Sequence, residues 1–309
     1  MSLPATSLPG AASRSRIGDD PLWRRLTLAP AFAVMLLLAA FPILNMLAMS
    51  FFSIQWIEAT AVWTPAGLAN YRAIPADNLV RAGVLNTLLF VVVAVGLEMV
   101  LGFFLALFCS RIGRGRIVYR TLFLLPILVP GIVVGAMWKL MYNYDFGIIN
   151  QAIGLIGLGP YDWLGSYGTA LLSVIVVDIW HWTPFCFLLL LAAIESLPQD
   201  VAEAAKIDGA TGWQELIHVT LPMLWPAILV TMGFRALTAF KVFDEVYLLT
   251  GGGPGTATEV LSFTIYQRFF TEDRVGYGSA LSIAVMFGVA LVMVVALSSR
   301  RGRAPEAAT

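Results

Sequence analysis

The residues with the clearest chemical capacity lie close together in one apolar stretch of the chain. Asp178, Trp182 and Phe185 are spaced four and three positions apart, so their side chains share one face of a helix. His181 lies among them. Carboxylate and imidazole groups can hydrogen-bond hydroxyls, and aromatic faces stack on C–H groups, so the cluster suits a sugar. The alternative is that Trp182 and neighbouring Trp180 belong to an aromatic belt at a membrane interface.

Three further ionisable residues, Glu98, Lys139 and Arg235, interrupt other apolar stretches. Such residues are functional candidates by default. For Glu98 and Lys139 we favour interior pairing that holds helices together, and Lys139 lies near enough to the end of its stretch to extend toward the interface. Arg235 allows an anionic solute such as a sugar phosphate. A pair between Arg235 and Asp178 across the pathway is an equal alternative.

The composition of the chain indicates that lipid surrounds most of it. Of 309 residues, 59% are hydrophobic and 12% are charged, and the mean hydropathy is +0.82. Soluble domains contain about 45–50% apolar and about 25% charged residues. Nineteen basic residues balance nineteen acidic ones, so the chain lacks the basic excess of a nucleic-acid-binding protein.

Six stretches are long and apolar enough to cross a hydrocarbon core, which takes about 20 helical residues. They are Leu28–Phe52, Val84–Phe108, Ile117–Met141, Ala170–Ile194, Leu221–Phe240 and Tyr277–Leu297. The third and fifth are weakest because they contain prolines and charges. We therefore expect an all-α integral membrane protein of six transmembrane helices, with a membrane domain over 28–298 between tails 1–27 and 299–309.

The positions of the basic residues predict the orientation, because cytoplasmic loops carry the excess of Lys and Arg. They gather in both tails and in the second and fourth loops, as Arg14, Arg16, Arg24, Arg25, Arg111, Arg114, Arg116, Arg120, Lys206, Arg300, Arg301 and Arg303. We expect both termini in the cytoplasm, an uncleaved first span and a place in the cell membrane. The outer loops Ser53–Gly83 and Lys241–Gly276 are long enough to form structure.

No motif in the sequence predicts catalysis, so no catalytic residue, metal or cofactor is assigned. There is no phosphate-binding loop with its Lys, and the glycine-rich run Gly251–Gly255 is read as a turn. His181 and His218 have no partner at metal-ligand spacing. Cys109 and Cys186 both lie in apolar runs, which predicts small buried residues rather than a disulfide.

The fourth loop, residues 196–222, carries more local structure than a linker requires. Ser196-Leu197-Pro198-Gln199 has the pattern of a helix start, predicting a helix over Pro198–Ile207 that Gly209 ends in a left-handed turn. Thr211-Gly212-Trp213-Gln214 offers a second start, for a helix to about Val219. The pattern predicts two short helices around one glycine, projecting from the membrane as a knob.

Helices this short are marginal alone in water, so the knob needs something to cover it. Its apolar residues are Ala204, Ala205, Ile207, Trp213, Leu216 and Ile217. The residues by themselves leave two possibilities open. The knob can bind a partner protein, or it can lie as an amphipathic turn on the membrane surface.

The same loop resembles the EAA loop of binding-protein-dependent ABC importer permeases. The resemblance rests on Glu203-Ala204-Ala205, on Gly209 six positions after Glu203, and on Val219-Thr220-Leu221-Pro222, where Val219 replaces the usual Ile. Two further stretches, Phe240-Lys241-Val242-Phe243-Asp244 and Leu249-Thr250-Gly251-Gly252-Gly253-Pro254, are similar to the carbohydrate-uptake branch, the maltose, trehalose and glycerol-3-phosphate type.

This resemblance implies a permease subunit of an ATP-driven sugar importer, not an enzyme, whose knob seats in a separate ATPase that binds the ATP. The coupling residues that it implies are Glu203, Ala204, Ala205, Asp208, Gly209, Ala210, Leu221 and Pro222. The implied partners are a homologous second permease, two ATPase copies, an extracytoplasmic solute-binding protein, a sugar or sugar derivative and membrane lipid. ATP binding would close the ATPases and switch the spans between inward- and outward-facing states.

Counting without gaps from the EAA loop, the sugar-contacting positions of the maltose permease fall on two spans. They are Asp178, His181, Trp182 and Phe185 in the fourth, and Arg235, Thr238, Ala239 and Val242 in and after the fifth. Most residue types differ, so the resemblance implies a shared pathway and leaves the solute open. The alternative is an ion-coupled secondary transporter that uses Asp178, His181 and Arg235 as a proton relay, although the inverted repeats common in such carriers are not evident.

Overall fold

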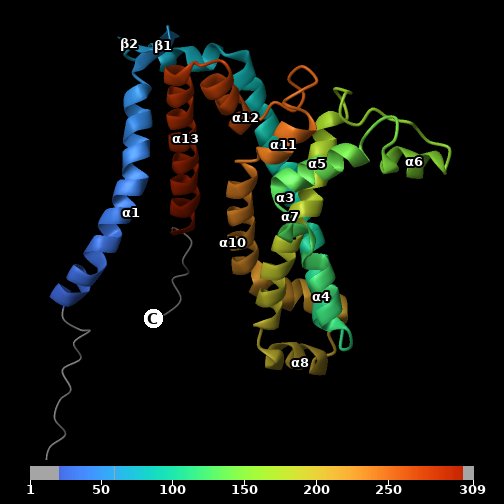
Figure 1. The fold of residues 1–309 in the computed structure, drawn as a ribbon. Coiled ribbons are helices and arrows are strands. Elements are labelled where there is room, and N and C mark those ends of the chain that lie inside the picture. The colour runs from blue at the N-terminus through green and yellow to red at the C-terminus, as the bar shows by residue number, and fades with distance from the viewer. Residues whose placement is uncertain (1–20, 59, 302–309) are drawn as a thin grey trace, which may run out of the picture.

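The chain folds into long helices joined by short ones, with one small hairpin (Figure 1). The computed structural model describes residues 21–58 and 60–301, so most of the expected tails lie outside the described residues. The elements are α1 (Pro21–Met49), β1 (Phe52–Ile57), β2 (Thr60–Pro65), α2 (Ala69–Ala73), η2 (Ile74–Ala76), α3 (Asn78–Arg111), α4 (Arg116–Leu124), η3 (Pro126–Leu128), α5 (Gly131–Met141), α6 (Ile148–Gly154), α7 (Ala170–Glu195), α8 (Gln199–Ile207), α9 (Gly212–Glu215), η4 (Leu216–Thr220), α10 (Leu221–Ala239), α11 (Asp244–Leu249), α12 (Leu261–Tyr266), η5 (Gln267–Thr271) and α13 (Val275–Arg301).

Five helical segments among the described residues are long and apolar enough to cross a membrane. They are Thr27–Met49, Asn78–Arg111, Ala170–Glu195, Gly212–Ala239 and Val275–Val295. These five contain the greater part of the first, second, fourth, fifth and sixth expected stretches. The prediction of a helical membrane protein is therefore confirmed at the level of its class.

The expected third span, Ile117–Met141, is not one helix. It is divided into α4, η3 and α5. Pro126 lies at the start of η3, and Pro130 is the residue before α5. A proline has no N–H to donate and clashes with the preceding turn, so two of them four residues apart break the helix. The sequence showed enough apolar residues for a span, but the prolines decide that they do not form one continuous rod.

The all-α prediction is also wrong in one place, because β1 and β2 form an antiparallel hairpin. Phe52 pairs with Pro65 and Ile57 with Thr60. The amide of Asn70 donates to the carbonyls of Ser50 at 2.9 Å and Phe52 at 3.0 Å, which fastens the hairpin base to α2. The expected outer loop Ser53–Gly83 thus forms structure, as its length predicted, but this structure includes a β-hairpin as well as short helices. In Figure 1 the hairpin lies at the end of the molecule opposite α8.

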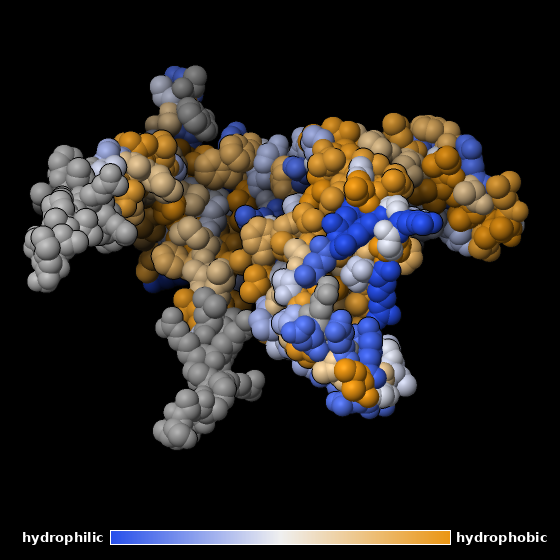
Figure 2. Space-filling view, turned by 90° about the horizontal axis from the view of Figure 1, so that it is seen from below, coloured by the Kyte–Doolittle hydropathy of each residue, from blue (hydrophilic) through white to orange (hydrophobic). Residues whose placement is uncertain are grey.

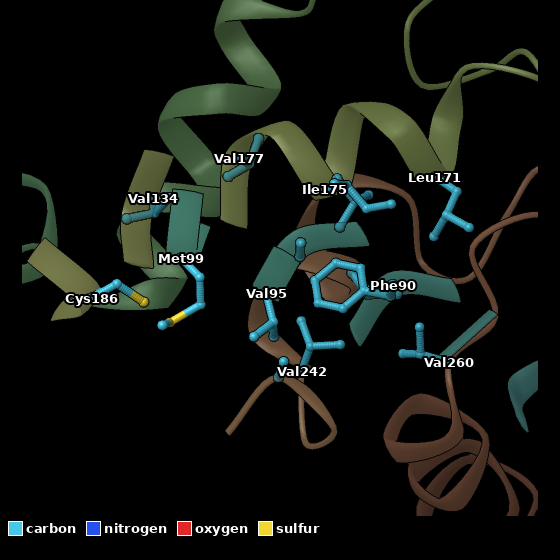
Figure 3. Packing of buried hydrophobic residues seen from close by; sticks show 14 of the residues in the cluster. Phe90, Val95, Met99, Val134, Leu171, Ile175, Val177, Cys186, Val242 and Val260 are labelled. Atoms are coloured by element: carbon cyan, nitrogen blue, oxygen red, sulfur yellow. The ribbon is translucent and has the colours of Figure 1, made fainter. Parts of the chain in front are cut away.

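The core forms where α3 packs along α7. Phe90, Val95 and Met99 of α3 lie against Val177 and its neighbours on α7, as Figure 3 shows. Gly102 permits the close approach, because a Cβ there would lie 2.8 Å from the Cβ of Cys186. Cys109 and Cys186 are buried and free, as expected.

The outer surface of the helices is apolar. The apolar part of α1 has none of its residues buried, and it leans away from the core toward its N-terminal end in Figure 1. Hydrophobic residues cover much of the surface seen from below in Figure 2, while hydrophilic residues gather where α4 and α8 lie. A helix that is apolar all round must be covered by lipid or by another protein.

Candidate functional site

The predicted turn at Gly209 is present and ends α8. Gly209 has φ +80°, a conformation that costs side-chain-bearing residues energy and glycine almost none. The N–H of Ala210 donates to the carbonyl of Ala205 at 2.9 Å, and that of Gly209 donates to Lys206 at 3.1 Å. These two bonds form a Schellman motif, which satisfies the last carbonyls of the helix.

Only the second of the two predicted helix starts forms as expected. Thr211 and Gln214 make a capping box, in which Thr211 N donates to Gln214 Oε1 at 2.8 Å and Gln214 N donates to Thr211 Oγ1 at 3.4 Å. The first predicted helix is present as α8, one residue shorter than expected, but Ser196 does not cap it. The Ser196 hydroxyl donates backward to the Ala193 carbonyl at 2.8 Å, because α7 extends to Glu195 and Ser196 closes it. Pro198 precedes α8 without a side-chain cap.

The knob is joined to the fifth span without a break. The chain passes from α9 through η4 directly into α10. Residues Gly212–Ala239 therefore form one helical segment that is long enough to cross a membrane. Pro222 does not interrupt this run, because η4, just before it, is a π-helical turn of the kind that is inserted into α-helices. A displacement of the knob would therefore be transmitted directly to α10.

The predicted coupling residues lie on an open surface. Glu203, Ala204, Asp208, Gly209 and Pro222 are exposed, and the remaining three (Ala205, Ala210 and Leu221) are partly buried. Beside them the side chains of Ile207 and Trp213 are 86% and 67% exposed, although both are apolar.

The base of the knob is held by charges and bordered by a groove. Arg116 and Arg120 of α4 both form ion pairs with Glu195 at the end of α7. A groove of about 710 Å³ separates α9 from the end of α3. It is lined by Phe104, Leu107, Phe108, Arg111, Ile112, Gly212, Trp213 and Leu216.

Between the helices, the guanidinium of Arg235 in α10 forms ion pairs with two carboxylates. Its Nε lies 2.6 Å from Glu98 Oε2, and its Nη2 donates to Glu98 Oε1 at 2.9 Å and also to Asp178. All three side chains are at most 2% exposed. Glu98 belongs to α3 and Asp178 to α7, so one guanidinium ties three spans together. The interior pairing favoured for Glu98, and the alternative of an Arg235–Asp178 pair, are both present.

Two further polar side chains, the buried His181 and the exposed Lys139, are also paired. His181 Nδ1 lies 3.1 Å from Glu245 Oε1, and Nε2 lies 3.0 Å from the Val129 carbonyl. Lys139 donates to the carbonyl of Leu248 at 2.8 Å. These contacts fasten α7 and α5 to α11 and the segment before α5. The side chain of Lys139 is thus engaged within the protein.

The predicted pathway residues divide into a buried and a surface group. The buried group contains Asp178, His181, Arg235, Ala239 and Val242, and the partly exposed group contains Trp182, Phe185 and Thr238. The Trp182 ring centroid lies 4.9 Å from Arg235 Cζ. Phe185 stacks on Phe234 with centroids 5.2 Å apart. The structure therefore places the predicted residues of the fourth and fifth spans next to one another. The charged side chains are buried, and the aromatic rings of Trp182 and Phe185 lie closer to the surface.

Two residues of this arrangement were not predicted from the sequence. Glu245 follows the similar stretch that ends at Asp244, and nothing local shows that it reaches His181. Phe234 lies beside Arg235 in the sequence, but an isolated aromatic residue in a span is ordinarily expected to face lipid. A four-residue spacing to Thr238 on the same helix is the one signal that could have indicated it.

These features define a helical membrane protein, with a capped loop at one end and a buried ion cluster between its spans. Residues 98–302 match the family model "Binding-protein-dependent transport system inner membrane component", and the chain belongs to that family. This confirms the resemblance drawn from the loop. Membership does not favour the alternative of an ion-coupled carrier.

Two relatives agree with this assignment, and a solved structure shares the fold. The chain is 38% identical over 237 residues, covering 77% of it and 80% of the relative, to the trehalose/maltose transport system permease protein MalF of Thermococcus litoralis. It is 34% identical over 301 residues, 94% of both chains, to the trehalose transport system permease protein SugA of Mycobacterium tuberculosis. The fold matches a chain of a bacterial ABC transporter that imports the acidic polysaccharide alginate, with a TM-score of 0.78, 23% identity and coverage of 92% and 96%.

Proposed function

We propose that this chain is a permease subunit of an ATP-driven importer of sugars or sugar derivatives, and that it forms half of the translocation pathway. The proposal rests on its family and on relatives named for trehalose and maltose transport. We expect it in the inner or plasma membrane with both termini in the cytoplasm. The alternating exposure of the pathway would be a rigid-body switch between two pre-existing states.

The single observation that supports coupling is the exposed knob. Ile207 and Trp213 flank the left-handed turn at Gly209, and neither side chain is covered by the described chain. A groove on a separate ATPase would bury them, while the Glu203 carboxylate would meet basic groups there. Because α9 continues into α10, movement of the knob would rotate the span that carries Arg235.

The sugar would pass along the exposed aromatic face rather than through the ion cluster. Trp182 and Phe185 can stack on the C–H face of a ring, and the Thr238 hydroxyl can hydrogen-bond to it. Asp178, His181, Arg235, Ala239 and Val242 would support this wall from behind. A homologous second permease would supply the other half of the pathway. Two ATPase copies and a solute-binding protein on the outer face would complete the transporter.

Transport in vesicles tests this proposal. The chain, its companion permease and the ATPase are reconstituted together, and the solute-binding protein is added outside. We expect uptake that needs ATP inside the vesicle and is indifferent to an imposed ion gradient. Uptake driven by a proton or sodium gradient without ATP would overturn the proposal.

The coupling role is tested by replacing Glu203 with Ala. We expect the variant to insert and assemble with the companion permease but to lose ATP-driven uptake, because the ATPase no longer receives its carboxylate. Asp145→Ala is the matched control, since Asp145 is an equally exposed acid in the loop before α6, away from the knob. Normal uptake by the Glu203 variant would contradict the assignment.

A further inference from the structure

The ion cluster at the centre of the spans bears on which solutes can cross. We infer that Arg235 is a positioning residue that does not bind the solute, and that the solute passing this chain is uncharged. This inference rests on the proposed function and narrows its substrate class. It excludes sugar phosphates and other anionic sugars, which an arginine in a span would otherwise suggest.

The guanidinium of Arg235 already has a hydrogen-bond partner on each of its terminal nitrogens and an ion contact at Nε. Glu98 occupies the edge formed by Nε and Nη2, and Asp178 takes a second bond from Nη2. Nη1 donates to Thr238 Oγ1 at 3.2 Å, and the Trp182 ring covers one face at 4.9 Å. To bind an anion, the guanidinium would have to leave a carboxylate unpaired in a site that is 1% exposed. Removing one partner from a buried ion pair is strongly unfavourable.

The charge balance of the cluster also opposes an anion. Glu98 and Asp178 place two carboxyl groups against one guanidinium. The neighbouring His181–Glu245 contact adds a third carboxyl and one imidazole. Acidic groups therefore outnumber fixed basic ones behind the aromatic face. The cluster therefore offers an incoming anion no unpaired positive charge.

No other cation inside the described spans takes over the role. Away from the helix ends, Arg235 is the single Lys or Arg in the five described spans. Lys139 lies on the shorter helix α5, outside those five spans, and donates to the Leu248 carbonyl. Lys241 is exposed, but it follows the end of α10 and lies outside the span. The surface left to the solute is Trp182, Phe185 and Phe234, which suits the apolar face of an uncharged sugar ring.

The test compares a broken cluster with a neutral one in the complete transporter. Arg235→Met leaves two buried carboxylates unpaired, and we expect the yield of assembled complex to fall about tenfold or more. Glu98→Gln/Asp178→Asn/Arg235→Met removes all three charges while keeping similar side-chain shapes. We expect it to restore assembly and to retain ATPase stimulation by the solute-binding protein, added as purified with the ligand that it holds.

The outcomes separate the two roles of Arg235. Restored assembly with wild-type stimulation supports a positioning role. Restored assembly with lost stimulation overturns it, because Arg235 would then act on the solute. If the triple variant fails to assemble, the single variant Asp178→Asn decides. In this variant Arg235 keeps a one-to-one pair with Glu98, so we expect stable assembly with normal stimulation. Loss of assembly would contradict the cluster geometry.

The charge of the solute is read directly by mass spectrometry of the ligand released from the binding protein. A polyhydroxylated molecule without an ionised group supports the inference, and a phosphate- or carboxylate-bearing one overturns it. Lys241→Gln should leave uptake unchanged, and a tenfold loss would show that an anion is guided by that residue. Failure of the proposed function would differ from all of these, because the wild-type complex itself would show no ATP-dependent uptake.

Discussion

The carboxylate of Asp77 accepts a hydrogen bond from the hydroxyl of Tyr277 at 2.9 Å, although 200 residues separate them. Asp77 also caps α3, accepting from the Leu79 N–H at 2.9 Å. Arg268 donates from Nη2 to the same carboxylate at 2.7 Å and from Nη1 to the carboxylate of Glu272. One side chain thus links the start of α3 to η5 and to the last span, at the end of the molecule away from the knob.

This link predicts an acid-dependent loss of stability. Burial raises the pKa of Asp77, but the bonds from Arg268, Tyr277 and Leu79 outweigh it, so the pKa lies below its ordinary value. A carboxyl with a lowered folded pKa stabilises the protein above its unfolded pKa of about 3.9, and that stability is lost as the pH falls through the folded value. We expect the Asp77→Asn variant to melt at a lower temperature than the wild type at neutral pH. The difference between the two melting temperatures should become smaller below about pH 4.

Thermal unfolding of the purified protein at several pH values measures this effect. Asp145→Asn is the control, since Asp145 is exposed and its carboxylate has no described ion pair. An Asp77→Asn curve parallel to the wild type from neutral pH to pH 3 would show that the carboxylate does not titrate as argued.

Asn86 predicts a local loosening of the glycine-rich turn. Its amide donates to the carbonyls of Thr256 and Glu259, both at 2.8 Å, and so holds the segment after the turn against α3. Asn86→Ala leaves two carbonyls without this donor, at a cost of about 1–3 kcal/mol. We expect faster hydrogen exchange over residues 256–261. Asn78→Ala, an exposed site on the same helix, should leave that exchange unchanged.

Gly209 predicts a coupling defect that arises from the backbone alone. A Cβ at this position would meet nothing within 4 Å, so Gly209→Ala introduces no clash. The left-handed φ of +80° would nevertheless cost an alanine about 1–2 kcal/mol. We expect normal insertion and about tenfold weaker retention of the ATPase in co-purification. Gly113→Ala, equally open but without a left-handed φ, is the control, and equal retention by both variants would refute the argument.

The exposure of Ile207 and Trp213 leads us to expect that the ATPase covers the knob. Ile207→Ser/Trp213→Ser removes two exposed apolar side chains, so it should release the ATPase while the protein remains in the membrane. Leu155→Ser is the control, since Leu155 is 89% exposed beside α6. If the double variant keeps the ATPase but its knob dissociates from lipid vesicles, the surface-lying alternative holds instead.

The sequence by itself determined the features whose causes are local. Hydropathy within each stretch marks five of the spans, and neighbouring residues decide the turn at Gly209 and the capping box at Thr211. Glycine conformation and cap hydrogen bonds act over a few positions, so their patterns can be read directly. The same reading fails at Ser196, because α7 extends far enough to use that hydroxyl for its own last turn.

Only the tertiary structure decided which charges meet. Glu98 and Arg235 lie 137 positions apart, and either could have faced a solute, lipid or another partner. Packing of α3 along α7 and α10 brings them within hydrogen-bond distance and buries both. The energy of a buried charge depends on what surrounds it, and those surroundings come from helices distant in sequence. The hairpin likewise depends on contacts that hydropathy does not register, such as those between Asn70 and the carbonyls of Ser50 and Phe52.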